Sequence, residues 1–135
     1  MRPSRTVSVS IECPLPQVYD FISDPENLPR WAAGLGGSVS KVNGEWIVQT
    51  SSGPMGIRFV ERNHFGVLDH RVTLQSGEEI LVPMRAVANQ DGSEVSVTVF
   101  RLPGMSAETF ARDVRLVERD LKTLKRTLEG KGRDA

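Results

Sequence analysis

Apolar residues recur every three or four positions near the end of the chain, and this stripe restricts the fold more than any other feature. Its members are Phe110, Val114, Val117, Leu121, Leu124 and Leu128. The spacing predicts an amphipathic helix from about Ala107 to Glu129, with Ser106 as its cap and Gly130 as its end. Such a helix would be roughly 34 Å long and must cover another apolar surface. The stripe would also suit a coiled coil, although it spans only about three heptads.

The first part of the chain predicts one strand and two short helices. Residues 6–12 alternate between polar and apolar side chains, which is the pattern of a half-buried strand. Prolines then precede apolar residues at helical spacing in the segment 14–22, so a short helix follows. Asp24 and Pro25 indicate the start of a second short helix that carries Trp31. Three glycines are expected to end it: Gly34, Gly36 and Gly37.

The segment 38–102 predicts an antiparallel meander of six further strands. Five turn signals separate its β-rich runs: Asn43-Gly44, Ser52-Gly53-Pro54, His64-Phe65-Gly66, Ser76-Gly77 and Asp91-Gly92. Runs joined by tight turns must pair antiparallel. The expected fold is therefore α+β, with a seven-stranded curved antiparallel sheet, two short helices after the first strand and one long C-terminal helix. We expect a single domain over residues 1–135, of which 130–135 form an unstructured tail.

Composition removes several classes of function. The chain has 17 basic and 17 acidic residues, so it offers no basic surface and no nucleic-acid partner is expected. Cys13 is the only cysteine, which excludes an internal disulfide and favours a reducing compartment. The two histidines, His64 and His70, do not form a metal-binding motif, and we expect no metal and no other cofactor. Without a signal peptide or membrane span, cytoplasmic residence is expected.

The predicted order of elements resembles the helix-grip fold of the START-like superfamily, also called SRPBCC and polyketide cyclase/dehydrase-like. The resemblance covers nearly the whole chain. Residues 18–31 resemble the opening helix of small bacterial members, whereas 65–70 and 83–85 resemble stretches of an uncharacterised bacterial subgroup. This resemblance implies a cavity between the sheet and the C-terminal helix, which accepts lipids, sterols, polyketides or aromatic hormones. Members of the superfamily include binders, cyclases and chaperone-linked domains.

His70 is the first candidate for chemistry in such a cavity. It alternates with Leu68 and Val72 and so shares their apolar face, while Asp69 must point away. On the preceding strand, Glu61 continues the inward phase of Met55, Ile57 and Phe59.

Matching the two apolar faces predicts that Phe59 or a near neighbour lies opposite His70, which leaves Glu61 at a diagonal position within reach. A carboxylate beside an imidazole could act as a general acid–base pair, Glu61 and His70. The alternative is that Glu61 is solvated and that a hydroxyl or carbonyl satisfies His70.

Two arginines could anchor an anionic group. Arg101 continues the inward phase of the last strand, although an exposed charge at a strand end is an equal alternative. Arg85 is out of phase with its apolar neighbours and should face solvent, unless Pro83 marks a bulge. The expected lining of the cavity, for which plain core packing is the alternative, is Trp31, Trp46, Phe59, Leu68, Met84, Val99, Arg101, Met105 and Phe110.

Three functions from different classes remain open. The first is binding or carriage of a small, largely apolar ligand, which suits an apolar pocket with few polar groups. The second is a cyclase, dehydratase or related lyase that uses Glu61 and His70. The third is a protein-interaction module of the same fold, for which a large exposed apolar patch would be the sign. A homodimer would be compatible with each of them.

Overall fold

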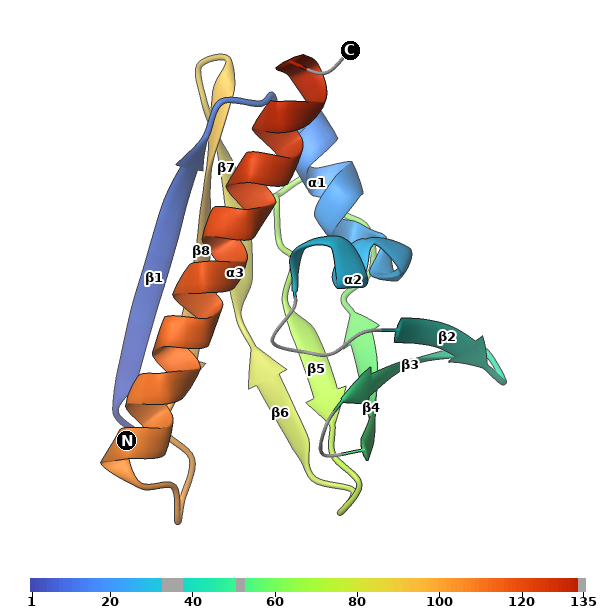
Figure 1. The fold of residues 1–135 in the computed structure, drawn as a ribbon, viewed down its shortest axis with the longest axis vertical. Helices are drawn as coiled ribbons and strands as arrows, with labels where there is room; N and C mark the ends of the chain where they lie inside the picture. The colour runs from blue at the N-terminus through green and yellow to red at the C-terminus, as the bar shows by residue number, and fades with distance from the viewer. Residues whose placement is uncertain (33–37, 51–52, 134–135) are drawn as a thin grey trace.

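The structure is a computed structural model, and it describes residues 1–32, 38–50 and 53–133. Figure 1 shows a long C-terminal helix that lies across one group of strands, with the short helices beside it. The elements in chain order are β1 (Ser4–Ile11), α1 (Leu15–Ser23), η1 (Pro25–Asn27), α2 (Leu28–Trp31), β2 (Ser38–Val42), β3 (Glu45–Thr50), β4 (Gly53–Phe59), β5 (His70–Thr73), β6 (Glu79–Val82), β7 (Met84–Asn89), β8 (Gly92–Phe100) and α3 (Ala107–Arg133).

The strands form two antiparallel sheets instead of the single seven-stranded sheet that the sequence predicted. One sheet has the order β1-β8-β7, and the other has the order β2-β3-β4-β5-β6. The predicted α+β class, the short helices after β1 and the long last helix are confirmed. The prediction of one sheet was wrong because the single strand predicted between the turns at Ser76-Gly77 and Asp91-Gly92 is divided into β6 and β7, which belong to different sheets.

Pro83 divides that run. Its ring nitrogen has no hydrogen to donate to a neighbouring strand, so a regular ladder cannot continue through it. Before Pro83, β6 pairs with β5, and after it β7 pairs with β8. The segment leading into β5 still reaches across the break, since Leu68 N–H donates to Met84 and Ala86 N–H donates to Gly66. The two sheets therefore meet at a joint beside Pro83.

Gly66 is required at this joint. A Cβ atom on Gly66 would lie 1.9 Å from the carbonyl oxygen of Ala86, and its φ of +72° is one that other residues rarely adopt. The predicted turn at His64-Phe65-Gly66 is in this way tied to β7. The close approach allows the chain to pass from β4 to β5 beside the neighbouring sheet.

The short helices begin where the sequence predicted. Pro16 lies in the first turn of α1, whose inner side buries Val18 and Ile22 completely. The Asp24 carboxylate accepts a hydrogen bond from Glu26 N–H and so caps the next turn. The predicted end at Gly34, Gly36 and Gly37 lies outside the described residues.

Helix α3 buries the predicted stripe against β1 and α2. Ser106 caps it as expected, because its hydroxyl accepts a hydrogen bond from Thr109 N–H at 3.1 Å. The expected end at Gly130 was wrong, since the helix runs to Arg133. A glycine inside a helix costs only about 1 kcal/mol and does not by itself end one. None of the helices in the described chain has the length and apolarity that a bilayer span requires.

Candidate functional site

Two rows of side chains cross the inner face of the five-stranded sheet. Consecutive register partners form each row, so the residues of a row stand side by side on neighbouring strands. The first row consists of Trp46, Ile57, Val72 and Ile80. The second consists of Phe59, His70 and Val82. Phe59 lies directly opposite His70, so the predicted register is confirmed. The second row places one imidazole between two apolar side chains.

His70 is buried, with 8% of its surface exposed. Its Nδ1 lies 3.1 Å from the carbonyl oxygen of Leu68, and its ring packs on Phe59 with 4.7 Å between the ring centres. Burial lowers the pKa of His70 below its ordinary value, although the Leu68 carbonyl and Asp69 oppose this. The imidazole is therefore held in the neutral form near neutral pH.

The hydrogen bond to Leu68 also sets the tautomer of His70. A carbonyl oxygen can only accept, so Nδ1 carries the proton and Nε2 keeps a free lone pair. No group in the described part of the chain donates to that nitrogen. The inner face of the sheet thus offers one hydrogen-bond acceptor within an apolar row.

Asp69 points to the other side of the strand, as alternation requires. Its carboxylate accepts from Arg85 through Nε at 3.1 Å and Nη2 at 2.9 Å, and also from Met84 N–H at 2.9 Å. The Arg85 guanidinium lowers the pKa of Asp69, and the partner carboxylate raises the pKa of Arg85. Arg85 is exposed, as its phase predicted. The Asp69–Arg85 ion pair therefore links the two sheets beside Pro83 and does not face the interior.

Glu61 does not meet His70. It lies beyond the last residue of β4, Phe59, and its side chain is exposed. No hydrogen bond or ion pair among the described residues joins the two side chains. The alternation of inward and outward side chains along β4 stops here, because the chain no longer pairs with β5 after Val60. The N–H of Val60 still donates to the carbonyl oxygen of Asp69.

Arg101 is half-buried and lies just after β8. Its Nε donates to the carbonyl oxygen of Met105 at 2.9 Å, and its backbone N–H donates to Pro3. The side chain thereby holds the turn that leads into α3, and Met105 belongs to the same turn. The geometry favours a structural role for both residues.

Trp31, at the end of α2, carries a buried polar group with no partner. Only 6% of the residue is exposed, and its Nε1 is the one sealed side-chain nitrogen or oxygen without a hydrogen bond among the described residues. A buried N–H that lacks an acceptor costs about 1 to 3 kcal/mol. Helix α2, which carries Trp31, contacts both α3 and β2 and so packs next to the five-stranded sheet (Figure 1). The Trp31 donor calls for an acceptor that the described chain does not supply.

The remaining predicted lining residues fall into two groups. Leu68 and Met84 are 1% exposed and belong to the closed core. The others are half-buried and pack against that core without being sealed by it: Trp46, Phe59, Val99 and Phe110.

One group in this region escaped the sequence prediction. Asp113 on α3 is half-buried, three positions after Phe110 and four before Val117, and burial raises its pKa. The sequence did contain a signal, because Asp113 has the same helical spacing as the apolar stripe. An Asp is charged, however, and was therefore not counted as a member of that stripe. Within the described residues no cluster of three or more His, Cys, Asp or Glu could hold a metal ion.

Solved structures with the same fold resemble this chain over most of its length. DynU16, from the dynemicin biosynthetic locus, is 20% identical with a TM-score of 0.70, covering 93% of this chain and 47% of its own. CalU16 from Micromonospora echinospora is 14% identical with a TM-score of 0.66, covering 94% and 74%. The Aha1 dimer from Colwellia psychrerythraea is 11% identical with a TM-score of 0.72, covering 94% and 96%.

These identities show a common fold and nothing finer. This chain spans about half of the DynU16 chain. No curated protein matches it in sequence. A family model described as polyketide cyclase / dehydrase and lipid transport matches residues 2–129. That match covers nearly all of the chain, and the element order and the long C-terminal helix agree with the START-like, helix-grip fold. The chain therefore belongs to the polyketide cyclase/dehydrase and lipid transport family.

Proposed function

We propose that the protein binds a small, largely apolar molecule with one or two polar oxygen atoms, between the inner face of the five-stranded sheet and helices α2 and α3. The observation that carries this proposal is the sealed Nε1 of Trp31, a hydrogen-bond donor without an acceptor. A carbonyl or ether oxygen on a ligand would remove the cost of that unpaired donor.

The character of the surrounding side chains supports an apolar ligand. Trp46, Phe59 and Val82 are half-buried on the inner face, so a bound molecule could still remove apolar surface from water. Each square ångström of apolar surface that becomes buried contributes about 25 cal/mol. The free Nε2 of His70 adds one acceptor, which suits a hydroxyl on the ligand.

Binding is favoured over the acid–base chemistry of a Glu61–His70 pair. A pair that transfers protons must lie within hydrogen-bond reach of the same reacting group. Glu61 is exposed beyond β4, whereas His70 is buried and burial lowers its pKa. Any catalytic step here would have to rely on His70 with a different partner.

The test uses two ligands of nearly equal shape, 2-acetylnaphthalene and 2-ethylnaphthalene, because only the first has a carbonyl acceptor. We expect the wild-type protein to bind 2-acetylnaphthalene more tightly. In Trp31→Phe, which keeps an aromatic ring and removes the N–H, that preference should fall about tenfold, the effect of roughly 1.4 kcal/mol. Trp46→Phe is the comparison, because it also removes one indole N–H: it should weaken both naphthalenes alike, since Trp46 lines the same face, and should leave the preference for 2-acetylnaphthalene intact. An unchanged preference in Trp31→Phe, or binding of neither naphthalene, would refute the proposal.

A further inference from the structure

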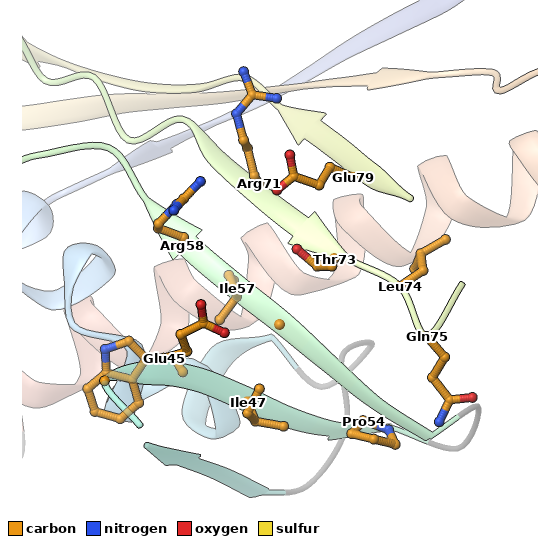
Figure 2. Close-up of a pocket in the computed structure, with 13 residues that line it drawn as sticks. Glu45, Ile47, Pro54, Ile57, Arg58, Arg71, Thr73, Leu74, Gln75 and Glu79 are labelled. Atoms are coloured by element: carbon orange, nitrogen blue, oxygen red, sulfur yellow. The ribbon is translucent and has the colours of Figure 1, made fainter. Parts of the chain in front are cut away.

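The outer face of the five-stranded sheet carries a hollow, on the opposite side from His70. Its volume is about 940 Å³. Ile47, Gly56 and Thr73 are successive register partners that form its floor. Thr73 alternates with the buried Val72, so the floor faces away from the interior. Figure 2 shows α3 behind the strands that carry this hollow.

Two arginines stand directly opposite each other beside this floor. Arg58 on β4 pairs with Arg71 on β5, and both side chains are exposed. Opposed residues on neighbouring strands have Cβ atoms about 4.5 to 5.5 Å apart, and like charges at that spacing are destabilising. The register therefore places two guanidinium groups side by side on the outer face of the sheet.

No carboxylate of the described chain forms an ion pair with either arginine. Arg62 binds Asp20 and Arg85 binds Asp69, but neither Arg58 nor Arg71 makes an ion pair or side-chain hydrogen bond within the described residues. Their guanidinium donors are free for a ligand. Two guanidinium groups side by side match the geometry of a carboxylate, which accepts hydrogen bonds at both oxygens.

The rim of the hollow limits the size of the anion. Glu45 and Glu79 flank the arginines on either side (Figure 2). They would repel a polyanion such as a nucleic acid, whereas a single carboxylate can be held by the two guanidinium groups alone. The floor is flat because Gly56 has no side chain, and Ile47 supplies an apolar surface next to it. A flat apolar body could lie there.

We propose that this hollow is a second binding site, which takes a compact aromatic carboxylate. The carboxylate lies between Arg58 and Arg71, and the ring lies on Ile47 and Gly56. This site is separate from the interior site, and neither proposal depends on the other.

The test compares 1-naphthoate with the neutral 1-naphthamide by isothermal titration calorimetry at low ionic strength on the full chain. We expect naphthoate to bind at least tenfold more tightly, because only naphthoate carries the charge. Arg58→Gln and Arg71→Gln should each weaken naphthoate about tenfold and should leave 2-acetylnaphthalene binding unchanged. Arg5→Gln, an exposed strand arginine in the other sheet, is the matched control.

A second variant tests the floor without changing any charge. The Gly56 backbone does not have a positive φ, and an added Cβ would meet Thr73 at an ordinary 3.4 Å. Gly56→Val should therefore fold normally and fill the hollow, weakening naphthoate about tenfold. Equal binding of naphthoate and naphthamide would overturn the proposal. So would arginine variants within twofold of the wild type, or displacement of naphthoate by 2-acetylnaphthalene, which would assign both to the interior.

Discussion

The two sheets differ in how completely their inner faces are buried. In the three-stranded sheet, Val95 is 0% exposed and Val97 is 5% exposed, and α3 packs along β1 beside them. In the five-stranded sheet, Trp46, Phe59 and Val82 stay half-buried, and a buried histidine interrupts the apolar rows. Close packing of the first kind contributes stability, whereas an incompletely covered apolar face leaves surface that a ligand can bury. The three-stranded sheet therefore belongs to the closed core, and the proposed binding site lies on the more open face of the five-stranded sheet.

The largest effect on stability should come from the core that α3 closes over the three-stranded sheet. Leu124 on α3 is 0% exposed, so Leu124→Ala should lower the free energy of unfolding by about 2 to 5 kcal/mol through lost burial and a cavity. Leu116→Ala on the same helix is the matched control, because Leu116 is only half-buried. Chemical denaturation measures both variants. If Leu116→Ala costs as much as Leu124→Ala, burial against the core is not what makes α3 stabilising.

The joint between the sheets gives the next effect. Asp69→Ala removes the acceptor of Met84 N–H as well as the partner of Arg85, and it should cost about 1 to 3 kcal/mol. Arg85→Ala removes only an exposed ion pair and should cost less than about 1 kcal/mol. Thermal unfolding of the two proteins separates these contributions. Equal losses would mean that the backbone hydrogen bond to Met84 is unimportant and that the joint is only an ion pair.

Substitutions on the inner face of the five-stranded sheet should change ligand affinity more than they change stability. Phe59→Ala removes an aromatic side chain of the inner wall, so 2-acetylnaphthalene affinity should fall about tenfold, or roughly 1.4 kcal/mol. The loss of stability should be smaller than that of Leu124→Ala. Phe65→Ala is the matched control, because Phe65 is 82% exposed. A titration in which both variants bind like the wild type would break the assignment of binding to this sheet.

The smallest effect is a pH dependence that arises from His70. Burial lowers the pKa of His70, so the folded protein binds a proton less readily than the unfolded chain. Stability is then fully present above the unfolded pKa of about 6.5 and falls as the pH decreases below it. Asp69 acts only at lower pH, because its contribution is lost as pH falls through its own lowered pKa.

The measurement is urea denaturation between about pH 7 and pH 5. His70→Gln should flatten the decrease in stability that the wild type shows over this range. His64→Gln is the matched control, because His64 is exposed. A wild-type decrease that persists unchanged in His70→Gln would show that another group causes it.

Periodicity predicted the parts of this molecule that depend on alternation and helical spacing. The burial of α3, the first strand and the pairing of Phe59 with His70 all followed from it. The same register also places Arg58 opposite Arg71, so the sequence contained the signal for the outer hollow.

Features that depend on local geometry were out of reach. The sequence allows a bulge at Pro83, but whether this proline bends a strand or divides two sheets depends on the partners on each side. Glu61 had the correct phase and still points to solvent, because the ladder ends at the joint. The unpaired N–H of Trp31 follows from how α2 packs, and no sequence pattern encodes it.

Nitrogen-edited NMR of the two tryptophan indole groups tests the central claim most directly. The chain has only Trp31 and Trp46, and Trp31→Phe assigns the two signals. If a ligand oxygen accepts from Trp31 Nε1, adding 2-acetylnaphthalene should shift the Trp31 indole proton downfield in a saturable way, while 2-ethylnaphthalene should not. A Trp31 signal that stays unchanged while 2-acetylnaphthalene saturates the protein would contradict the claim that this donor faces the ligand.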